Sequence, residues 1–76
     1  MEKMTKLTAV IQREENFYVS LCPELDIASQ GTTIEEARRN LLEAVELFLE
    51  VASDKEIERR LATSEFYVTP LEVAFG

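Results

Sequence analysis

Apolar and polar residues alternate along the first third of the chain with the two-residue period of β-strands. Residues 6–14 and 17–21 each gather apolar side chains on one face, and β-branched or aromatic residues occur in both. The short polar break between them predicts an antiparallel hairpin. Pro23 is expected to end the second strand, because proline has no backbone N–H to donate to a sheet. Residues 27–30 are expected to form a short third strand.

The apolar spacing becomes helical after Gly31, which breaks the extended run. Thr33 followed by Glu36 three residues later predicts a capping box, in which each side chain accepts a hydrogen bond from the backbone N–H of the other residue. The helix that begins there has one apolar face, made of Ile34, Ala37, Leu41, Ala44, Val45, Phe48 and Ala52. Its opposite face is charged and carries Glu35, Arg39, Glu43, Glu46 and Glu50. Arg39 lies four residues from both Glu35 and Glu43, a spacing that allows i,i+4 ion pairs with each.

Residues 54–61 predict either a short second helix, capped by Ser53 or Asp54, or a continuation of the first. Residues 65–75 are again typical of a strand, but Pro70 splits them and implies an edge position, a bulge or a bend. The order is therefore β-β-β-α-β around one main helix. It predicts a small α+β domain in which that helix packs on a mixed sheet and the last strand lies parallel to an earlier one.

The charge of the chain limits the classes of partner. Fifteen acidic and eight basic residues give a formal net charge of −7, which argues against direct nucleic-acid binding because phosphates are bound by clustered Lys and Arg. An acidic surface attracts basic proteins, but it also keeps a small protein soluble, and composition leaves both interpretations open. The chain shows no signal-peptide pattern and no run of about 18 apolar residues, so we expect a cytoplasmic protein without membrane contact.

Side chains that support catalysis are few. The chain has no His, the commonest general base and metal ligand. Its one cysteine, Cys22, is followed by Glu24 and Asp26, which would raise the pKa of the thiol, and we expect a structural, mostly buried side chain there. The carboxylates fall mainly on the solvent face of the predicted helix and do not converge from neighbouring strands as a two-metal site requires. We therefore expect no enzyme activity, no metal site and no cofactor.

The stretch from Cys22 to Ala37 contains Cys-Pro-Glu-Leu, Ser-Gln-Gly and a Thr-x-Glu-Glu-Ala helix start, and it resembles the HicB family of antitoxins. The resemblance covers residues 7–52 and implies a partial ribonuclease-H-like fold without nuclease activity. It also implies a partner, a small basic HicA-like ribonuclease toxin whose RNA-cleaving site the antitoxin blocks. Asp26 and Ile27 replace the Pro-Gly turn of many relatives. Residues 1–76 are expected to form a single HicB-like domain of the short form, without the DNA-binding domain that often follows.

The residues that we expect to contact this partner lie around the second strand, with help from exposed acids: they are Phe17, Tyr18, Pro23, Glu24 and Leu25. The alternative function is a solitary homo-oligomeric regulatory or structural module without a toxin partner. Such a module would pair through an exposed strand edge and through Leu47 or residues 73–75. The two are compatible, since an antitoxin can itself be a homodimer or a higher homo-oligomer, and a chain this small gains stability from pairing.

Overall fold

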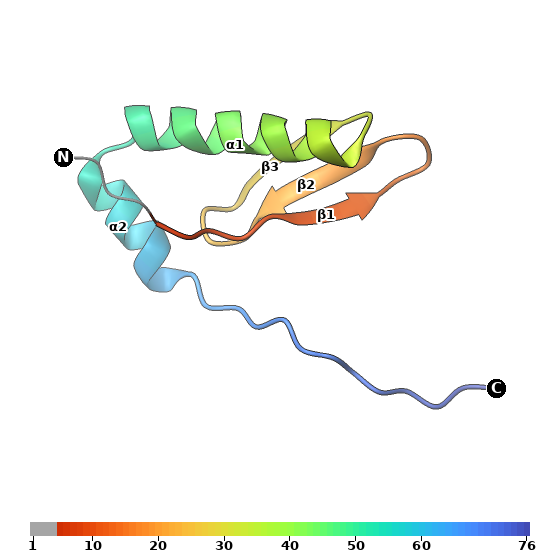
Figure 1. Cartoon of the computed structure of the whole chain (residues 1–76). Helices are drawn as coiled ribbons and strands as arrows, with labels where there is room; N and C mark the ends of the chain where they lie inside the picture. The colour runs from red at the N-terminus through yellow and green to blue at the C-terminus, as the bar shows by residue number, and fades with distance from the viewer. Residues whose placement is uncertain (1–4) are drawn as a thin grey trace.

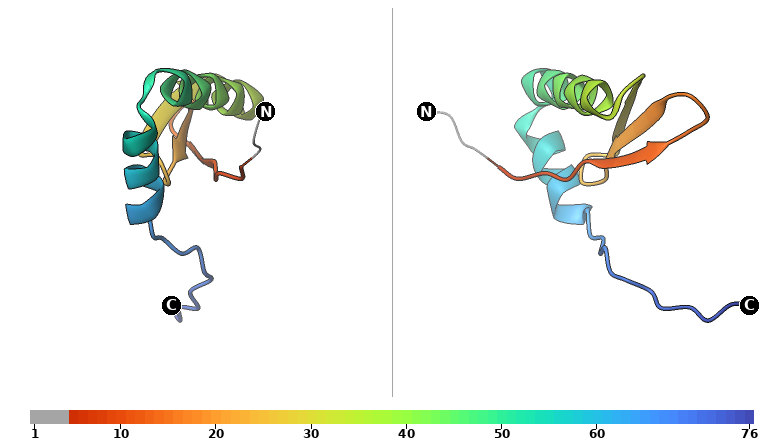
Figure 2. Two further views of the ribbon diagram at one scale, coloured as in Figure 1. Left: turned by 90° about the vertical axis from the view of Figure 1, so that its left-hand side faces the viewer. Right: turned by 45° about the vertical axis from the view of Figure 1, so that its right-hand side comes forward.

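The computed structural model describes residues 5–76, and its helices and strands follow the expected order (Figure 1). They are β1 (Val10–Arg13), β2 (Tyr18–Cys22), β3 (Ile27–Gly31), α1 (Ile34–Val51) and α2 (Asp54–Thr63). The strands form one antiparallel sheet in the order β1-β2-β3. Helix α1 covers one face of this sheet, and α2 lies beside the end of the sheet where a turn joins β2 to β3 (Figure 2). The α+β class and the β-β-β-α order are confirmed.

The register of the sheet decides which side chains face α1. Ser20 of β2 is paired with Ile11 of β1 and with Ser29 of β3, and residues paired across antiparallel strands lie on the same face. Ser20 is fully buried, so this is the face beneath α1. Val19 and Leu21 point to the opposite face because successive side chains alternate along a strand. That second face, which is the more apolar side of β2, is covered by neither helix (Figure 2).

Helix α1 begins at the residue that the sequence predicts. The hydroxyl oxygen of Thr33 accepts a hydrogen bond from the backbone N–H of Glu36 at 3.0 Å. The carboxylate of Glu36 accepts hydrogen bonds from the backbone N–H of Thr32 at 2.8 Å and from its hydroxyl at 3.2 Å. The N-cap is therefore confirmed, but the reciprocal bond of the capping box reaches one residue further back than expected.

The hydrophobic core lies between α1 and the sheet and is small. Ser20 is the polar side chain buried with it: its hydroxyl donates a hydrogen bond of 2.8 Å to the carbonyl oxygen of Ala37, so its burial leaves no unpaired donor. Ile34, expected on the apolar face of α1, is instead more than half exposed. The buried apolar residues are Cys22, Leu25, Ala37, Leu41 and Val45.

A separate second helix follows α1, as one of the two sequence interpretations expects. The hydroxyl of Ser53 accepts a hydrogen bond from the N–H of Glu56 at 3.1 Å and so caps α2. Helix α2 is held against the rest of the domain by Arg60. Its guanidinium lies 4.6 Å from the centre of the Phe48 ring and donates a hydrogen bond to the carbonyl oxygen of Leu25.

The final strand predicted over residues 65–75 is absent from the structure. These residues follow α2 without regular secondary structure and run away from the sheet (Figure 1). The sheet is therefore purely antiparallel, and the expectation of a mixed sheet with a parallel last strand is wrong for this structure. Strand propensity is realised only when a neighbouring strand supplies hydrogen bonds, and Pro70 removes one of the donors that could make them.

Candidate partner-binding surface

The five residues expected to contact a partner lie at the two ends of β2. Phe17 and Tyr18 lie at its start, beside the β1–β2 turn, whereas Pro23, Glu24 and Leu25 follow its end and form the β2–β3 turn. The strand between them spans about 17 Å, at 3.3 Å per residue. The structure therefore separates them into two groups. Whether any of them contacts a partner stays a prediction.

At the start of β2, Tyr18 lines a shallow recess with the residues that begin α1. The recess has a volume of about 450 Å³, and its other lining residues are Thr32, Thr33, Ile34 and Glu35. Ile34 is largely exposed here, and the Glu35 carboxylate stands beside it on the first turn of the helix. This end of the sheet therefore offers an apolar side chain next to an acidic one.

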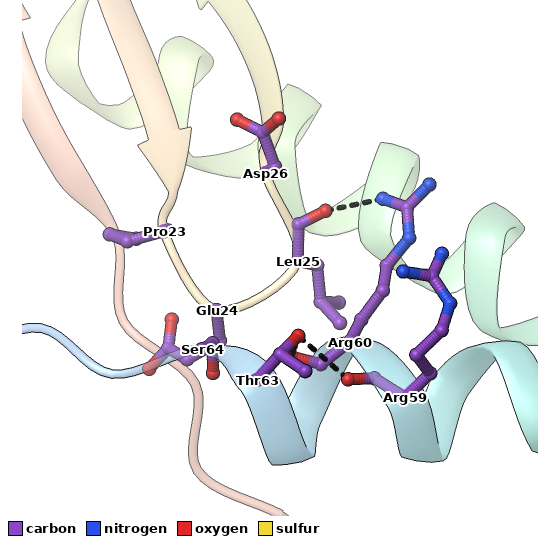
Figure 3. A pocket seen from close by; sticks show the side chains of 8 residues that line it. All are labelled: Pro23, Glu24, Leu25, Asp26, Arg59, Arg60, Thr63 and Ser64. Carbon is purple, nitrogen blue, oxygen red and sulfur yellow. Dashed lines mark hydrogen bonds between the residues drawn. The ribbon is translucent and has the colours of Figure 1, made fainter.

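At the other end of β2, a recess of about 350 Å³ lies between the β2–β3 turn and α2 (Figure 3). Residues 23–26 line it on one side, and Arg59, Arg60, Thr63 and Ser64 line it on the other. Figure 3 shows the Arg60 side chain reaching from α2 to the carbonyl oxygen of Leu25, a hydrogen bond of 2.5 Å. Residues 35 positions apart in the chain meet in this contact, and no motif in the sequence indicates it.

The charges of this recess are partly neutralised. Arg59 and Arg60 both bind the carboxylate of Glu56, at 2.6 Å and 2.9 Å respectively. The two guanidinium groups lower the pKa of the Glu56 carboxyl by hydrogen bonding. Two acids, Glu24 and Asp26, and two arginines line the recess itself, so its lining carries charges of both signs.

The β2–β3 turn passes through one residue with a left-handed backbone. Asp26 has a φ of 56°, in the left-handed region that Asp tolerates better than most residues. Proline could not occupy this position, because its ring holds φ near −65°. The preceding Leu25 is 0% exposed, so its side chain belongs to the core and supports the turn from beneath.

Glu24 fastens the turn to the segment that precedes β1. Its carboxylate accepts hydrogen bonds from the N–H of Thr8 at 3.0 Å and from the Thr8 hydroxyl at 2.7 Å. These bonds take the N–H of residue 8 out of the sheet, and β1 begins at Val10 instead of at residue 6. Partial burial opposes ionisation of Glu24, but the bonds from Thr8 outweigh it and hold the pKa of this carboxyl below its usual value.

Replacing Glu24 with Gln is expected to lower the free energy of unfolding at pH 7 by about 1 kcal/mol, because a neutral amide accepts weaker hydrogen bonds than a carboxylate. The folded-state pKa of Glu24 is lowered, so its stabilisation is present above the ordinary pKa and is lost as the pH falls through the folded value. Urea unfolding between pH 7 and pH 3 should show the advantage over E24Q disappearing at the acidic end. Glu14→Gln, in the exposed β1–β2 turn, is the control, and a pH dependence in E24Q equal to that of the unaltered chain would refute this role.

Cys22, beside the same turn, is not an activated nucleophile. The side chain is buried, as the sequence predicts. Burial raises the pKa of the thiol, and the carboxylate of Glu24, 3.5 Å from Sγ, adds to the increase. The thiolate that nucleophilic chemistry needs is therefore disfavoured.

The outer face of α1 carries a stripe of carboxylates that we call the acidic ridge. At 100° per residue the members of the ridge fall within an arc of about 80°, on the side of α1 that faces away from the sheet. Two exposed apolar side chains, Leu47 and Val51, follow its margin. The ridge consists of the exposed residues Glu35, Glu43, Glu46 and Glu50, and the exposed Arg39 lies within the same arc as its one basic residue.

The carboxylates of the ridge are not paired with Arg39. The expected ion pairs of Arg39 with Glu35 and Glu43 do not form: among residues 5–76, ion pairs shorter than 4.0 Å join only Glu56 to the two arginines of α2. The sequence therefore identified the ridge correctly but overestimated its neutralisation. A helix face with this charge is available to a basic partner.

Residues 5–76 contain neither a metal site nor a membrane-spanning helix. No three or more side chains of Cys, Asp or Glu are grouped there so that they could hold a metal ion. Neither α1 nor α2 combines the length and the apolar character needed to cross a membrane.

The chain is similar to one curated protein over nearly the full length of both. A protein of Helicobacter pylori described as "UPF0150 protein" is 39% identical to it over 71 residues. The aligned region covers 92% of this chain and 97% of the Helicobacter protein. No family model and no solved structure matches the chain.

Proposed function

The chain belongs to the UPF0150 family, and from this premise we propose that it is a non-enzymatic antitoxin of the HicB type. It binds a small basic HicA-like ribonuclease toxin in the cytoplasm and blocks the toxin's RNA-cleaving site. The sequence support is the stretch from Cys22 to Ala37, which resembles the HicB family of antitoxins. The stretch forms the β2–β3 turn, β3 and the first turn of α1. Blocking the toxin's site in this way requires a surface complementary to it in shape and charge, and it requires no cofactor.

The acidic ridge is the observation that carries this proposal. A protein that cleaves RNA must offer positive charge to the phosphates of its substrate. A protein that covers that site competes best when its own surface is negative, because complementary charge speeds encounter and excludes wrong partners. The ridge places four carboxylates and the single base Arg39 on one helix, without an ion pair to any of residues 5–76, and its first and last members are about 22 Å apart along the axis.

The apolar residues next to the ridge supply the second requirement of a binding surface. Affinity in protein interfaces comes mostly from a few buried apolar anchors, whereas charges contribute more to association rate and specificity. Leu47 and Val51 lie along one margin of the ridge, and Ile34 lies with Tyr18 at its N-terminal end. Tyr18, one of the expected contact residues, therefore lies next to the ridge.

Reversing the charge of the ridge is expected to weaken toxin binding strongly. Glu43→Lys combined with Glu50→Lys should raise the Kd for the small basic protein encoded next to this chain by about 100-fold or more, since each like-charge contact opposes binding. Isothermal titration calorimetry with the two purified proteins measures this change. Its control is Glu15→Lys combined with Glu58→Lys, which alters the net charge equally but on the β1–β2 turn and α2. Equal losses in both variants would remove the ridge as the binding surface.

A second candidate function is a solitary homo-oligomeric regulatory or structural module with no toxin partner. It is favoured by the apolar side chains that the structure leaves exposed after α2, among them Leu71, Val73 and Phe75. The failure of every small basic protein encoded nearby to bind, together with a stable oligomer, would support this function over the first. Self-association and toxin binding are also compatible in one protein.

A further inference from the structure

Residues 65–75, which we call the C-terminal segment, carry half of the large exposed apolar side chains found in residues 5–76. Three of them, Leu71, Val73 and Phe75, are 86%, 68% and 96% exposed. They occupy alternate positions and so share one face of an extended chain. Exposed apolar surface concentrated in one segment is typical of a surface that another element covers.

A groove of about 490 Å³ of matching character lies between residues 5–9 and α1. It exists because α1 packs mainly against β3 and β2 and makes little contact with β1, so the side of the domain next to β1 stays open. Leu7 lines the groove on the strand side, and Cys22 is also among its lining residues. The apolar side chains that α1 contributes are Leu41, Leu42, Val45 and Leu49.

The strand beside this groove also has an unpaired edge. Within residues 5–76, the order β1-β2-β3 pairs one side of β1 with β2 and leaves its other side without a strand partner. The other side presents backbone N–H and C=O groups that a further strand can bind. The corresponding edge of β3 is partly blocked, because the side-chain amide of Asn40 donates a 2.8 Å hydrogen bond to the carbonyl oxygen of Gln30. The free β1 edge and the apolar groove together form a site for an extended apolar chain.

The C-terminal segment of the same chain is poorly placed to fill this groove. Ser64 lines the recess next to Glu24, and Glu24 binds Thr8, so the segment starts near residue 8. Every residue of an extended strand advances the chain by about the same distance. If the segment began level with residue 8 and ran parallel to β1, its sixth residue, Pro70, would lie level with Arg13, where β1 ends. The last three apolar residues would then extend past the sheet, whereas the groove lies along residues 5–9.

Charge also fits the segment to the groove. Lys6 and Arg38 line the groove, together with the single acid Glu46. The segment carries Glu65 and Glu72 and has no basic residue. The lining of the groove therefore has an excess of one positive side chain, which favours an acidic segment over a basic one.

We infer that the C-terminal segment of a second copy of this chain occupies the groove, pairs with the free edge of β1 and places Leu71, Val73 and Phe75 against α1. The exchange is mutual, so the two copies form a closed dimer about a two-fold axis. Each copy contributes its segment and the residues lining its groove, which approaches the roughly 20–30 residues per side of a stable interface. The dimer completes the sheet with the strand that the isolated chain lacks, and it does not depend on the proposed toxin.

The oligomeric state of the full chain tests this exchange. Sedimentation equilibrium between 1 and 100 µM should give a dimer of about 17 kDa, twice the chain mass of 8.7 kDa. Leu71→Asp combined with Val73→Asp should raise the dimer Kd by at least about 100-fold. It should keep the helical circular dichroism of α1 and α2, because both substituted side chains are exposed in the single chain and lie outside these helices. The control, Leu47→Asp combined with Val51→Asp, adds the same charge elsewhere and should remain dimeric.

A cross-link identifies which chain supplies the segment. Leu42→Cys in the groove and Val73→Cys in the segment are made in separate chains, one with a mass tag, then mixed and oxidised. Both chains also carry Cys22→Ala, because Cys22 lines the groove and its thiol could react in place of Leu42→Cys. A disulfide between the two different chains is the expected result. A monomer at every concentration, a dimer that survives L71D/V73D, or a disulfide that forms only within a chain carrying both cysteines would overturn the exchange. None of these measurements uses the toxin, so their outcome is separate from that of the proposed antitoxin function.

Discussion

Gly31→Ala is expected to lower the free energy of unfolding by about 3 kcal/mol. A Cβ at position 31 would lie 2.5 Å from the backbone nitrogen of Ala37 and 2.8 Å from the carbonyl carbon of Glu36. Both are main-chain atoms of the first turns of α1, so no side-chain rotation relieves the overlap and β3 must move away from α1. A domain of 76 residues has a total stability of about 4–11 kcal/mol, and the loss is a large share of it.

Thermal unfolding followed by circular dichroism measures this loss as a fall in Tm of about 12–24 °C. Gln30→Ala is the matched control. Its side chain is exposed, and the hydrogen bond from Asn40 goes to its main-chain carbonyl, which the substitution retains. We expect a change within about 0.5 kcal/mol for the control. If G31A proved as stable as Q30A, the close approach of β3 to α1 would be refuted.

Leu25→Ala is expected to cost about 3–4 kcal/mol, in the range measured for buried leucines that leave a cavity. Leu25 has no exposed surface and belongs to the core cluster with Cys22, Leu41 and Val45. Its carbonyl oxygen also receives the Arg60 guanidinium that holds α2 in place. Movement of the β2–β3 turn into the cavity would weaken that bond as well.

Urea unfolding tests the effect of Leu25→Ala against Leu47→Ala. The second leucine is 60% exposed on α1, and its removal should change the free energy of unfolding by less than about 1 kcal/mol. Equal midpoints for the two variants would show that Leu25 is not a core residue.

The local elements of this fold were readable in the sequence because their signals are local. Alternation over residues 17–21 and the polar break before it predicted the hairpin, and Thr33 and Glu36 predicted the start of α1. The pattern did not tell which face of β2 packs under the helix. Ser20 is on the buried side, where its hydroxyl bonds to the carbonyl oxygen of Ala37, and this pairing over 17 residues has no sequence signal.

The parts that sequence reasoning missed depend on distant partners. The strand expected over residues 65–75 needs a neighbour, and no neighbour is present in the single chain. The recess formed by the β2–β3 turn and α2 depends on the contact of Arg60 with Leu25, far apart in the sequence. Of the expected contact residues, Tyr18 lies next to the acidic ridge, while Glu24 and Leu25 have structural roles in the turn.

The proposed dimer and the proposed toxin complex use different sides of α1. The groove takes up the side of the helix that carries Leu42 and Leu49, and the acidic ridge faces away from the sheet. Glu46 is the one residue that belongs to both. A dimer formed by exchange would therefore leave Glu43 and Glu50 free, so each copy could bind its own toxin.

The most direct test of the antitoxin function is RNA cleavage by the small basic protein encoded beside this chain, titrated with the purified chain. The proposal predicts that cleavage stops at about one chain per toxin, and that E43K/E50K protects the RNA only at concentrations about 100-fold higher or more. The titration needs no assumption about oligomeric state. Cleavage that continues unchanged in an excess of the folded, unaltered chain would contradict the antitoxin function.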